Sequence, residues 1–323
     1  MVSGLDTWAA GFIALLIAII YVVVILKIMG NSSVSLITML GQRSPALGAI
    51  FGIILAFNFV LIAIVYLYDF QTFMNMTSFP KTPPVIIDLL LISLSVYAVL
   101  LGWEVLARIA GFLLLPVIFL VLWGVVPSLF TIDFLPELIP LGSWTDVLKG
   151  AFFHTAVYGE LLVLVMLLPL TKKPSGTAKY IIVPMVFSAL LIAALALALF
   201  GDYSAVNTAP DVTYKLFSLF RLLGRYEALF IVLWVCTFFV KITIFYFAAI
   251  QGLGDALKLK SPKATALPLA AVITFLGITS FSNYIEYLSF LLNYYPFFAL
   301  AIELTLLPFL LIALPREQAL KTG

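Results

Sequence analysis

The stretch IIVPMVFSALLIAALALALF, residues 181–200, decides the fold class of this chain. It carries no charged side chain, is apolar on every face of a helix, and matches the roughly 20 residues that a helix needs to cross a bilayer. A second run, residues 290–314, has nearly the same character. A transmembrane β-barrel would instead show segments of about ten residues with strict alternation of apolar and polar side chains. We therefore predict membrane-spanning helices.

The composition extends this prediction to the whole chain. Of its 323 residues, 64% are hydrophobic and only 10% are charged, and the mean hydropathy is +1.22. A soluble domain carries about 25% charged residues. The length is sufficient for roughly ten spans. We predict an all-α, polytopic transmembrane helical bundle that forms a single membrane domain over residues 1–323.

The same residues argue against several classes of protein. The net charge of +2 is small and scattered, which does not indicate a nucleic-acid partner. With Cys236 as its one cysteine and His154 as its one histidine, the chain lacks the residues for an intramolecular disulfide or a Cys- or His-rich metal site. No HExxH, GxSxG or phosphate-binding glycine loop is present. We expect a protein that is not an enzyme and that binds no metal or cofactor.

Polar breaks with turn-forming residues divide the chain into nine apolar spans. The spans cover about residues 8–29, 46–76, 84–102, 105–128, 146–170, 178–201, 226–252, 264–283 and 291–314. Between the sixth and seventh spans, residues 211–223 place aromatic and leucine side chains against Lys215 and Arg221. This pattern indicates either an interfacial amphipathic helix or a helix that merely caps the bundle.

The basic residues predict the orientation. If the loop after the first span is cytoplasmic, that side holds eleven Lys and Arg residues against five on the other, with Lys241 inside a span. The excess of basic residues on cytoplasmic loops then makes the C-terminus cytoplasmic and the N-terminus external. Residues 1–7 provide neither a basic flank nor a signal sequence. Either a preceding helix is missing, which we infer, or the first span inserts unaided.

Three ionisable residues lie deep in predicted spans: Glu160, Lys241 and Glu303. An ionisable side chain at mid-bilayer costs at least about 2.5–3.5 kcal/mol, so one that persists usually faces a cavity or a partner. Glu160 and Glu303 are both candidate partners for Lys241, whose ammonium group can also take the place of a sodium ion. A fixed structural ion pair is the alternative. Four further charged residues lie near span ends, where we expect them to reach the headgroups: Asp69, Asp88, Glu104 and Arg108.

The fifth span joins a polar half, GAFFHTAVYGE at residues 150–160, to an apolar half. Its glycines weaken a helix by about 1 kcal/mol each relative to alanine, and its polar side chains can bond to opened backbone. This favours a discontinuous helix, the device with which transporters build binding sites. A continuous helix that bonds only to its neighbours is the alternative. Together with one residue a turn before Lys241, the candidate substrate-binding residues are Phe153, His154, Thr155, Tyr158, Gly159 and Thr237.

Several short motifs occur in an order that resembles a known family. They are GLDTW at residues 4–8, Arg108, PELIPLG at 136–142, the block at 153–160 with its closing Leu168-Pro169, Lys172-Lys173, and the stretch at 234–241. Their order and spacing are similar to those of the B subunit of spore-germination nutrient receptors, the GerAB-like endospore germination permeases of the amino acid–polyamine–organocation superfamily. The similarity runs over nearly the whole chain.

The resemblance implies a five-plus-five inverted-repeat transporter-like fold with ten helices, in which broken helices 1 and 6 hold the substrate and helices 3 and 8 line it. Mapped by order, nine of the ten helices are present, and the fifth and seventh spans look like helices 6 and 8. The family's glycine-containing first helix is the one without a counterpart. The resemblance also implies a small nutrient ligand such as an amino acid, a receptor A subunit and a C lipoprotein as partners, and the inner membrane of a bacterial spore or a cell membrane as the location.

Three functions follow as hypotheses. The favoured one is a membrane subunit of a spore germinant receptor that binds a small nutrient to trigger germination. The alternative is a proton-coupled amino acid transporter, with Lys241 in the ion site and Glu160 as a gate or relay; Glu303 belongs to the same ion-coupling or gating set. The third is a structural membrane subunit that only holds partners. 

Overall fold

The computed structural model describes residues 7–29, 32, 34–129, 143–171, 179–187, 190 and 227–313, and all regular structure in them is helical. Seven helical stretches in this part of the chain are long and apolar enough to cross a membrane. The predicted all-α, polytopic membrane bundle is thereby confirmed. Most of the predicted sixth span and the whole of the predicted interfacial helix at 211–223 lie outside the described residues.

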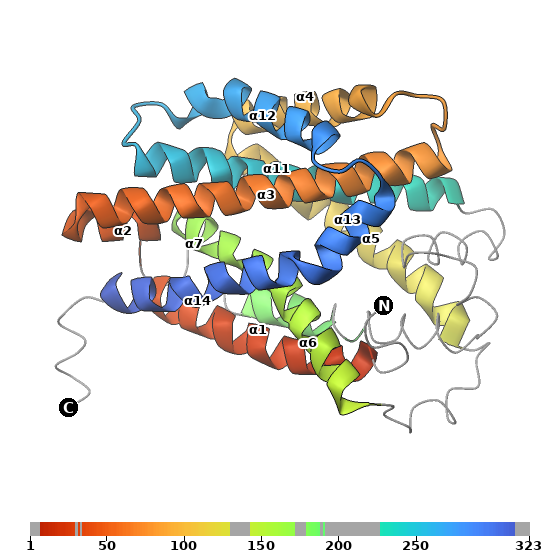
Figure 1. The fold of residues 1–323 in the computed structure, drawn as a ribbon, viewed down its shortest axis with the longest axis horizontal. Coiled ribbons are helices and arrows are strands. Elements are labelled where there is room, and N and C mark those ends of the chain that lie inside the picture. Colours follow the sequence, from red (N-terminus) through yellow and green to blue (C-terminus); the bar gives the residue numbers. More distant parts are fainter. Residues whose placement is uncertain are drawn as a thin grey trace.

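Figure 1 shows how the helices of the described residues are arranged. The first five are α1 (Thr7–Met29), α2 (Leu36–Arg43), α3 (Pro45–Thr77), α4 (Pro84–Leu101) and α5 (Trp103–Leu129). The fifth predicted span forms α6 (Trp144–Tyr158), the 3₁₀-helix η2 (Gly159–Val163), α7 (Leu164–Leu167) and the 3₁₀-turn η3 (Leu168–Leu170). The later elements are α11 (Glu227–Ala256), η5 (Pro262–Thr265), α12 (Ala266–Thr279), α13 (Tyr284–Asn293) and α14 (Tyr295–Ala313).

Local sequence explains where several helices begin and end. Prolines open α3 and α4, where a missing backbone N–H costs nothing. Gly102 ends α4 with a φ of +105°, a conformation that side chains other than glycine disfavour. Asn283 caps α13 by accepting a hydrogen bond from the Glu286 backbone N–H at 2.9 Å. The last predicted span, 291–314, overlaps α13 and α14, which meet at Tyr294.

Two groups of helices lie side by side. In the α3–α11 group, α3 packs along α11, and α4 and α12 cover them; in the α1–α6 group, α1 and α14 pack against α6 (Figure 1). Small residues let α3 and α11 approach closely, because a Cβ on Gly52 would lie 2.7 Å from the Cβ of Ala256, and a Cβ on Gly252 would lie 3.5 Å from that of Ala56. Each helix thus carries a small-xxx-small pattern at the contact, a typical device of membrane helix pairs.

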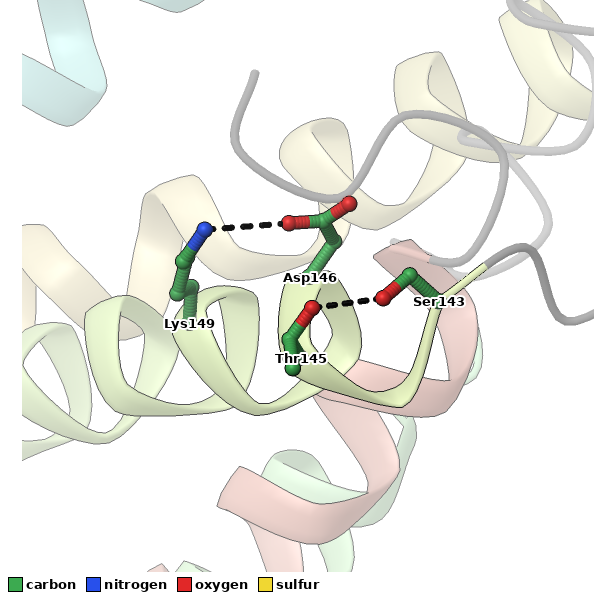
Figure 2. A network of polar contacts seen from close by, with 4 residues as sticks. All are labelled: Ser143, Thr145, Asp146 and Lys149. Atoms are coloured by element: carbon green, nitrogen blue, oxygen red, sulfur yellow. Dashed lines mark hydrogen bonds and ion pairs between the residues drawn. The ribbon is translucent and has the colours of Figure 1, made fainter.

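An exposed ion pair lies at the N-terminus of α6. Figure 2 shows Asp146 and Lys149 one turn apart, with 3.2 Å between the carboxylate oxygen and Nζ. Beside them the hydroxyls of Ser143 and Thr145 are hydrogen-bonded at 2.5 Å. Both charged side chains are largely exposed, so the pair adds little to stability. It provides a reference for the charges that are buried within the bundle.

Candidate ligand-binding site

Lys241, Glu160 and Tyr66 form a compact charged cluster between the two helix groups. Nζ of Lys241 on α11 lies 3.0 Å from Oε2 of Glu160 on η2. The Tyr66 hydroxyl on α3 donates a hydrogen bond to the other Glu160 oxygen, Oε1. The ammonium also lies 3.6 Å from the centroid of the Tyr66 ring, a cation–π distance. One carboxylate and one aromatic ring therefore compensate the Lys241 charge, and the cluster ties the α3–α11 group to the segment that follows α6.

Glu160 is positioned by a change of helix type. The α-helical bonding of α6 ends at Tyr158, and Gly159–Val163 continue as a 3₁₀-helix. The sequence predicted an interruption here, and the α-helix does stop; however, the backbone of Gly159 stays in the helical region at φ −59° and ψ −19°. The segment is therefore tightened rather than unwound. A 3₁₀ stretch inside a longer helix often marks a functional hinge.

Gly159 makes room for Glu303. A Cβ on Gly159 would lie 1.6 Å from Oε1 of Glu303, so the carboxyl group of α14 rests where any larger residue would place its side chain. Oε1 of Glu303 is buried and has no hydrogen-bond partner among the described residues. Tyr21 and Tyr295 lie within electrostatic range of this carboxyl group, and Tyr295 is also within range of Glu160. Lys241 pairs with Glu160 rather than with Glu303 in this part of the chain.

A cavity of about 540 Å³ opens beside the charged cluster. This volume lies within the range of small-ligand pockets. Its polar lining comes from Tyr158, Glu160, Thr237 and Lys241. The remaining walls are apolar and come from α5, α11 and the segment around η2: Ala110, Leu113, Leu114, Val117, Val157, Leu161, Val163, Val240, Ile244 and Phe245. A cation and an anion thus line a cavity whose walls are mostly apolar.

The candidate residues from the sequence divide into two sets. Tyr158, Glu160, Thr237 and Lys241 line the cavity. Five others are not part of its lining: Phe153, His154, Thr155, Gly159 and Glu303.

Three members of the second set, all on α6, make contacts within their own helix. Thr155 is buried, and its hydroxyl donates to the carbonyl of Ala151 at 2.8 Å, which is a bond within its own helix. The Phe153 ring lies edge-on to His154 with 5.9 Å between the ring centroids. The cavity lining therefore distinguishes between residues that the sequence analysis grouped together as candidates.

Tyr66 is the residue that sequence reasoning missed. It lies within the apolar run of α3, which offers no reason to single it out. Its ring does pack, at 6.0 Å from Phe238 and 6.5 Å from Phe245 between ring centroids. Only the hydroxyl group reveals the second role, since a buried phenol normally needs a hydrogen-bond partner. The sequence does not indicate which group the hydroxyl bonds, because Glu160 lies 94 residues away in the chain.

The prediction that charged residues near span ends reach the headgroups is wrong for Asp88. Glu104 and Arg108 are exposed and form a 2.7 Å ion pair on α5. Asp88, however, is completely buried, with 0% of its surface exposed. The reason is its position on the inner face of α4, between buried Ile87 and Leu91. Distance from a span end indicates depth in the bilayer but not which face of the helix a residue occupies.

Comparison with known proteins identifies the family. The sequence profile of the family described as "Spore germination protein" matches residues 2–285. The chain belongs to this family of spore germination proteins. Spore germination protein KB of Bacillus subtilis (strain 168) is 28% identical over 277 residues, which cover 80% of this chain and 72% of that protein. The putative spore germination protein YfkT of the same organism is 26% identical over 290 residues, which cover 87% of this chain and 79% of that protein.

Family membership agrees with the resemblance found in the motifs. The spore germination proteins are matched across both the α6–η2 segment and α11, the elements that carry Glu160 and Lys241. None of the matching descriptions denotes an enzyme. The chain is therefore an integral, multi-pass membrane protein of the spore germination family.

Proposed function

We propose that this spore germination protein is the nutrient-binding membrane subunit of a germinant receptor. The observation that carries the proposal is the cavity between α5, η2 and α11, with the Lys241–Glu160 pair in its lining. Family membership supports a role in germination. In this proposal the protein acts in the inner membrane of a bacterial spore or in a cell membrane, with a cytoplasmic C-terminus, together with an A subunit and a C lipoprotein.

The charge balance favours a zwitterionic ligand such as an amino acid. Lys241 and Glu160 together are neutral, so a ligand with net charge would leave an uncompensated charge in a site of low dielectric constant. The Lys241 ammonium has further N–H donors for a carboxylate, and Oε2 of Glu160 accepts from an ammonium. The apolar walls suit an aliphatic side chain. The ligand would therefore replace the direct ion pair by two bonds to its own charged ends.

The position of the cluster supports a signalling role. Lys241 and Tyr66 belong to the α3–α11 group, whereas Glu160 follows α6 of the other group. A ligand that binds between them favours whichever relative placement of the groups gives it the better contacts. In the proposed receptor, this change of placement is what the partner subunits sense.

The proposal is tested by ligand-dependent thermal stability of the purified protein in lipid. The probes are L-valine, its deaminated analogue isovalerate and its decarboxylated analogue isobutylamine. We expect L-valine alone to raise the melting temperature. Lys241→Met should abolish the shift, and Lys149→Met, the matched change at the surface pair, should leave it intact. Equal shifts with all three probes, or an unchanged shift in Lys241→Met, would contradict the site.

A proton-coupled amino acid transporter is the second candidate. Glu303 favours it, because its Oε1 atom is buried against Gly159 without a hydrogen-bond partner among the described residues, as a proton-carrying group would be. A carrier should accumulate labelled amino acid in proteoliposomes under a pH gradient and lose this activity in Glu303→Gln. A receptor subunit should bind the same amino acid without accumulating it.

A further inference from the structure

Asp88 is the most deeply buried acidic side chain in the described residues, and it lies away from the cavity. None of its surface is exposed, and neither carboxyl oxygen has a hydrogen-bond partner there. It belongs to α4, within a stretch apolar enough to span the membrane. An isolated carboxylate in such surroundings is very costly unless its charge is neutralised. Something must therefore neutralise Asp88.

The carboxyl group is enclosed by α3, α4 and α12. It rests against Gly277 of α12, because a Cβ on that glycine would lie 3.6 Å from Oδ2 of Asp88 and 2.9 Å from Cδ2 of Leu67. On the same glycine, the backbone carbonyl accepts a hydrogen bond from Nε2 of Gln71 at 3.3 Å. Oε1 of Gln71 is itself buried without a partner among the described residues. The Asp88 and Gln71 side chains, each with an unpartnered acceptor atom, thus both lie against one glycine.

No basic side chain is available to neutralise the acid. The segments of α3, α4 and α12 contain no lysine, arginine or histidine. Of the neighbouring helices, α11 carries only Lys241, which is bound to Glu160, and α5 carries only Arg108, which is exposed and paired with Glu104. Lys263 of η5 donates to the Leu100 carbonyl at 2.8 Å, at the end of α4 more than three turns from Asp88. An ion pair with any of these cations is therefore absent from this part of the chain.

The other titratable groups around α4 do not satisfy Asp88 either. α12 contains none, and Tyr97 of α4 itself is 61% exposed. The other helices that pack against α4 also carry titratable groups that are not cationic. In the described residues these are Tyr66, Tyr68, Asp69, Glu104, Cys236, Tyr246 and Asp255. None of them hydrogen-bonds either oxygen of Asp88.

We propose that Asp88 holds a proton, as a neutral carboxylic acid, in an internal site closed by α3, α4 and α12. This inference does not rest on the proposed function. Protonation removes the charge and converts an acceptor-only group into one with an O–H donor. A metal cation fits less well, because hard cations take several oxygen ligands and the Leu67 side chain occupies part of the same contact.

The consequence is that the proton acts as a structural ligand of the α3–α11 group. While it is bound, the interface of α4 with α3 and α12 is free of net charge. Its loss would leave a carboxylate buried among apolar side chains, so α12 and α4 would have to part to admit water. Proton release at Asp88 is therefore coupled to opening of this interface.

Infrared spectroscopy of the full chain in lipid membranes tests the proposal. The wild-type spectrum should contain the C=O stretch of a protonated carboxylic acid that Asp88→Asn removes. The matched change Asp146→Asn, at an exposed aspartate, should remove a carboxylate band instead. If Asp88→Asn also removes a carboxylate band, the residue is ionised and the proposal is wrong.

Two further measurements on the same proteins decide between the remaining outcomes. Because asparagine is a neutral analogue of the protonated acid, Asp88→Asn should fold and melt within about 3 °C of the wild type; failure of this variant to fold, beside a folded Asp146→Asn, would overturn the proposal. Exchange of sodium chloride for choline chloride should leave the wild-type melting temperature unchanged. A sodium-dependent shift that Asp88→Asn abolishes would assign the site to Na⁺ and likewise overturn it.

Discussion

Glu160 and Asp88 are both acidic residues inside membrane-spanning helices, but their surroundings differ. Glu160 lies between two helix groups, bonds to Lys241 and Tyr66, and borders a cavity. Asp88 lies inside one group, against Gly277, without a partner in the described residues. From this difference we infer that a paired carboxylate beside a cavity can exchange its partner for a ligand. A fully buried carboxyl group without a partner can exchange only a proton.

The largest expected effect comes from breaking the pair at Glu160. Lys241→Met leaves a carboxylate that is only 12% exposed without its cation, and removing one partner of a buried pair typically costs about 3–5 kcal/mol. Because Lys241 is 36% exposed, we expect the lower end of that range. Chemical unfolding in detergent measures the loss. The double variant Lys241→Met/Glu160→Gln should recover most of the stability; if it is no better than the single variant, the pair is not the cause.

The next effect concerns the contact beside the pair. Gly159→Ala places a methyl group where the Glu303 carboxyl lies, and overpacking of this kind costs about 1–3 kcal/mol. The same substitution in a Glu303→Ala background should cost far less, because the colliding group is gone. The difference between the two measured losses gives the coupling between the residues. Equal losses in both backgrounds would show that Glu303 does not occupy this space in the membrane.

Tyr66→Phe tests whether the hydroxyl, rather than the ring, supports Glu160. The substitution removes the donor to Oε1 and keeps the ring beneath Lys241, so we expect a loss of about 1–2 kcal/mol. Tyr97→Phe is the control, since that side chain is 61% exposed on the outer surface of α4. A loss equal to that of the control would remove Tyr66 from the cluster.

The smallest effect is expected at the surface. Asp146→Asn breaks the exposed pair with Lys149 at the start of α6, and such pairs contribute about 0.2–1 kcal/mol. Asp146→Asn should change the free energy of unfolding by less than either Lys241→Met or Tyr66→Phe does. Raising the salt concentration should reduce the Asp146→Asn effect further, because the ions screen exposed charges. A large, salt-independent loss would show that exposure is a poor guide to the energetics of charge in this fold.

The sequence singled out Glu160 and Lys241, because depth in a predicted span follows directly from counting apolar residues, and the structure pairs the two. It also placed the change in helix type near Gly159, since glycine next to polar side chains weakens an α-helix. It failed for Tyr66 and for the face of Asp88. Both α3 and α4 are apolar on nearly all sides, so their sequences do not distinguish lipid-facing from protein-facing positions.

The sequence by itself determined that this chain is a bundle of membrane helices, because the cost of exposing polar groups to lipid fixes composition and length. It also predicted that Glu160, Lys241 and Glu303 lie deep in spans. Only the tertiary structure decided that Lys241 pairs with Glu160 and not with Glu303, that Gly159 makes room for Glu303, and that Asp88 faces inward. The reason is physical: pairing and burial depend on distances between helices far apart in the chain, and neither periodicity nor hydropathy encodes those distances.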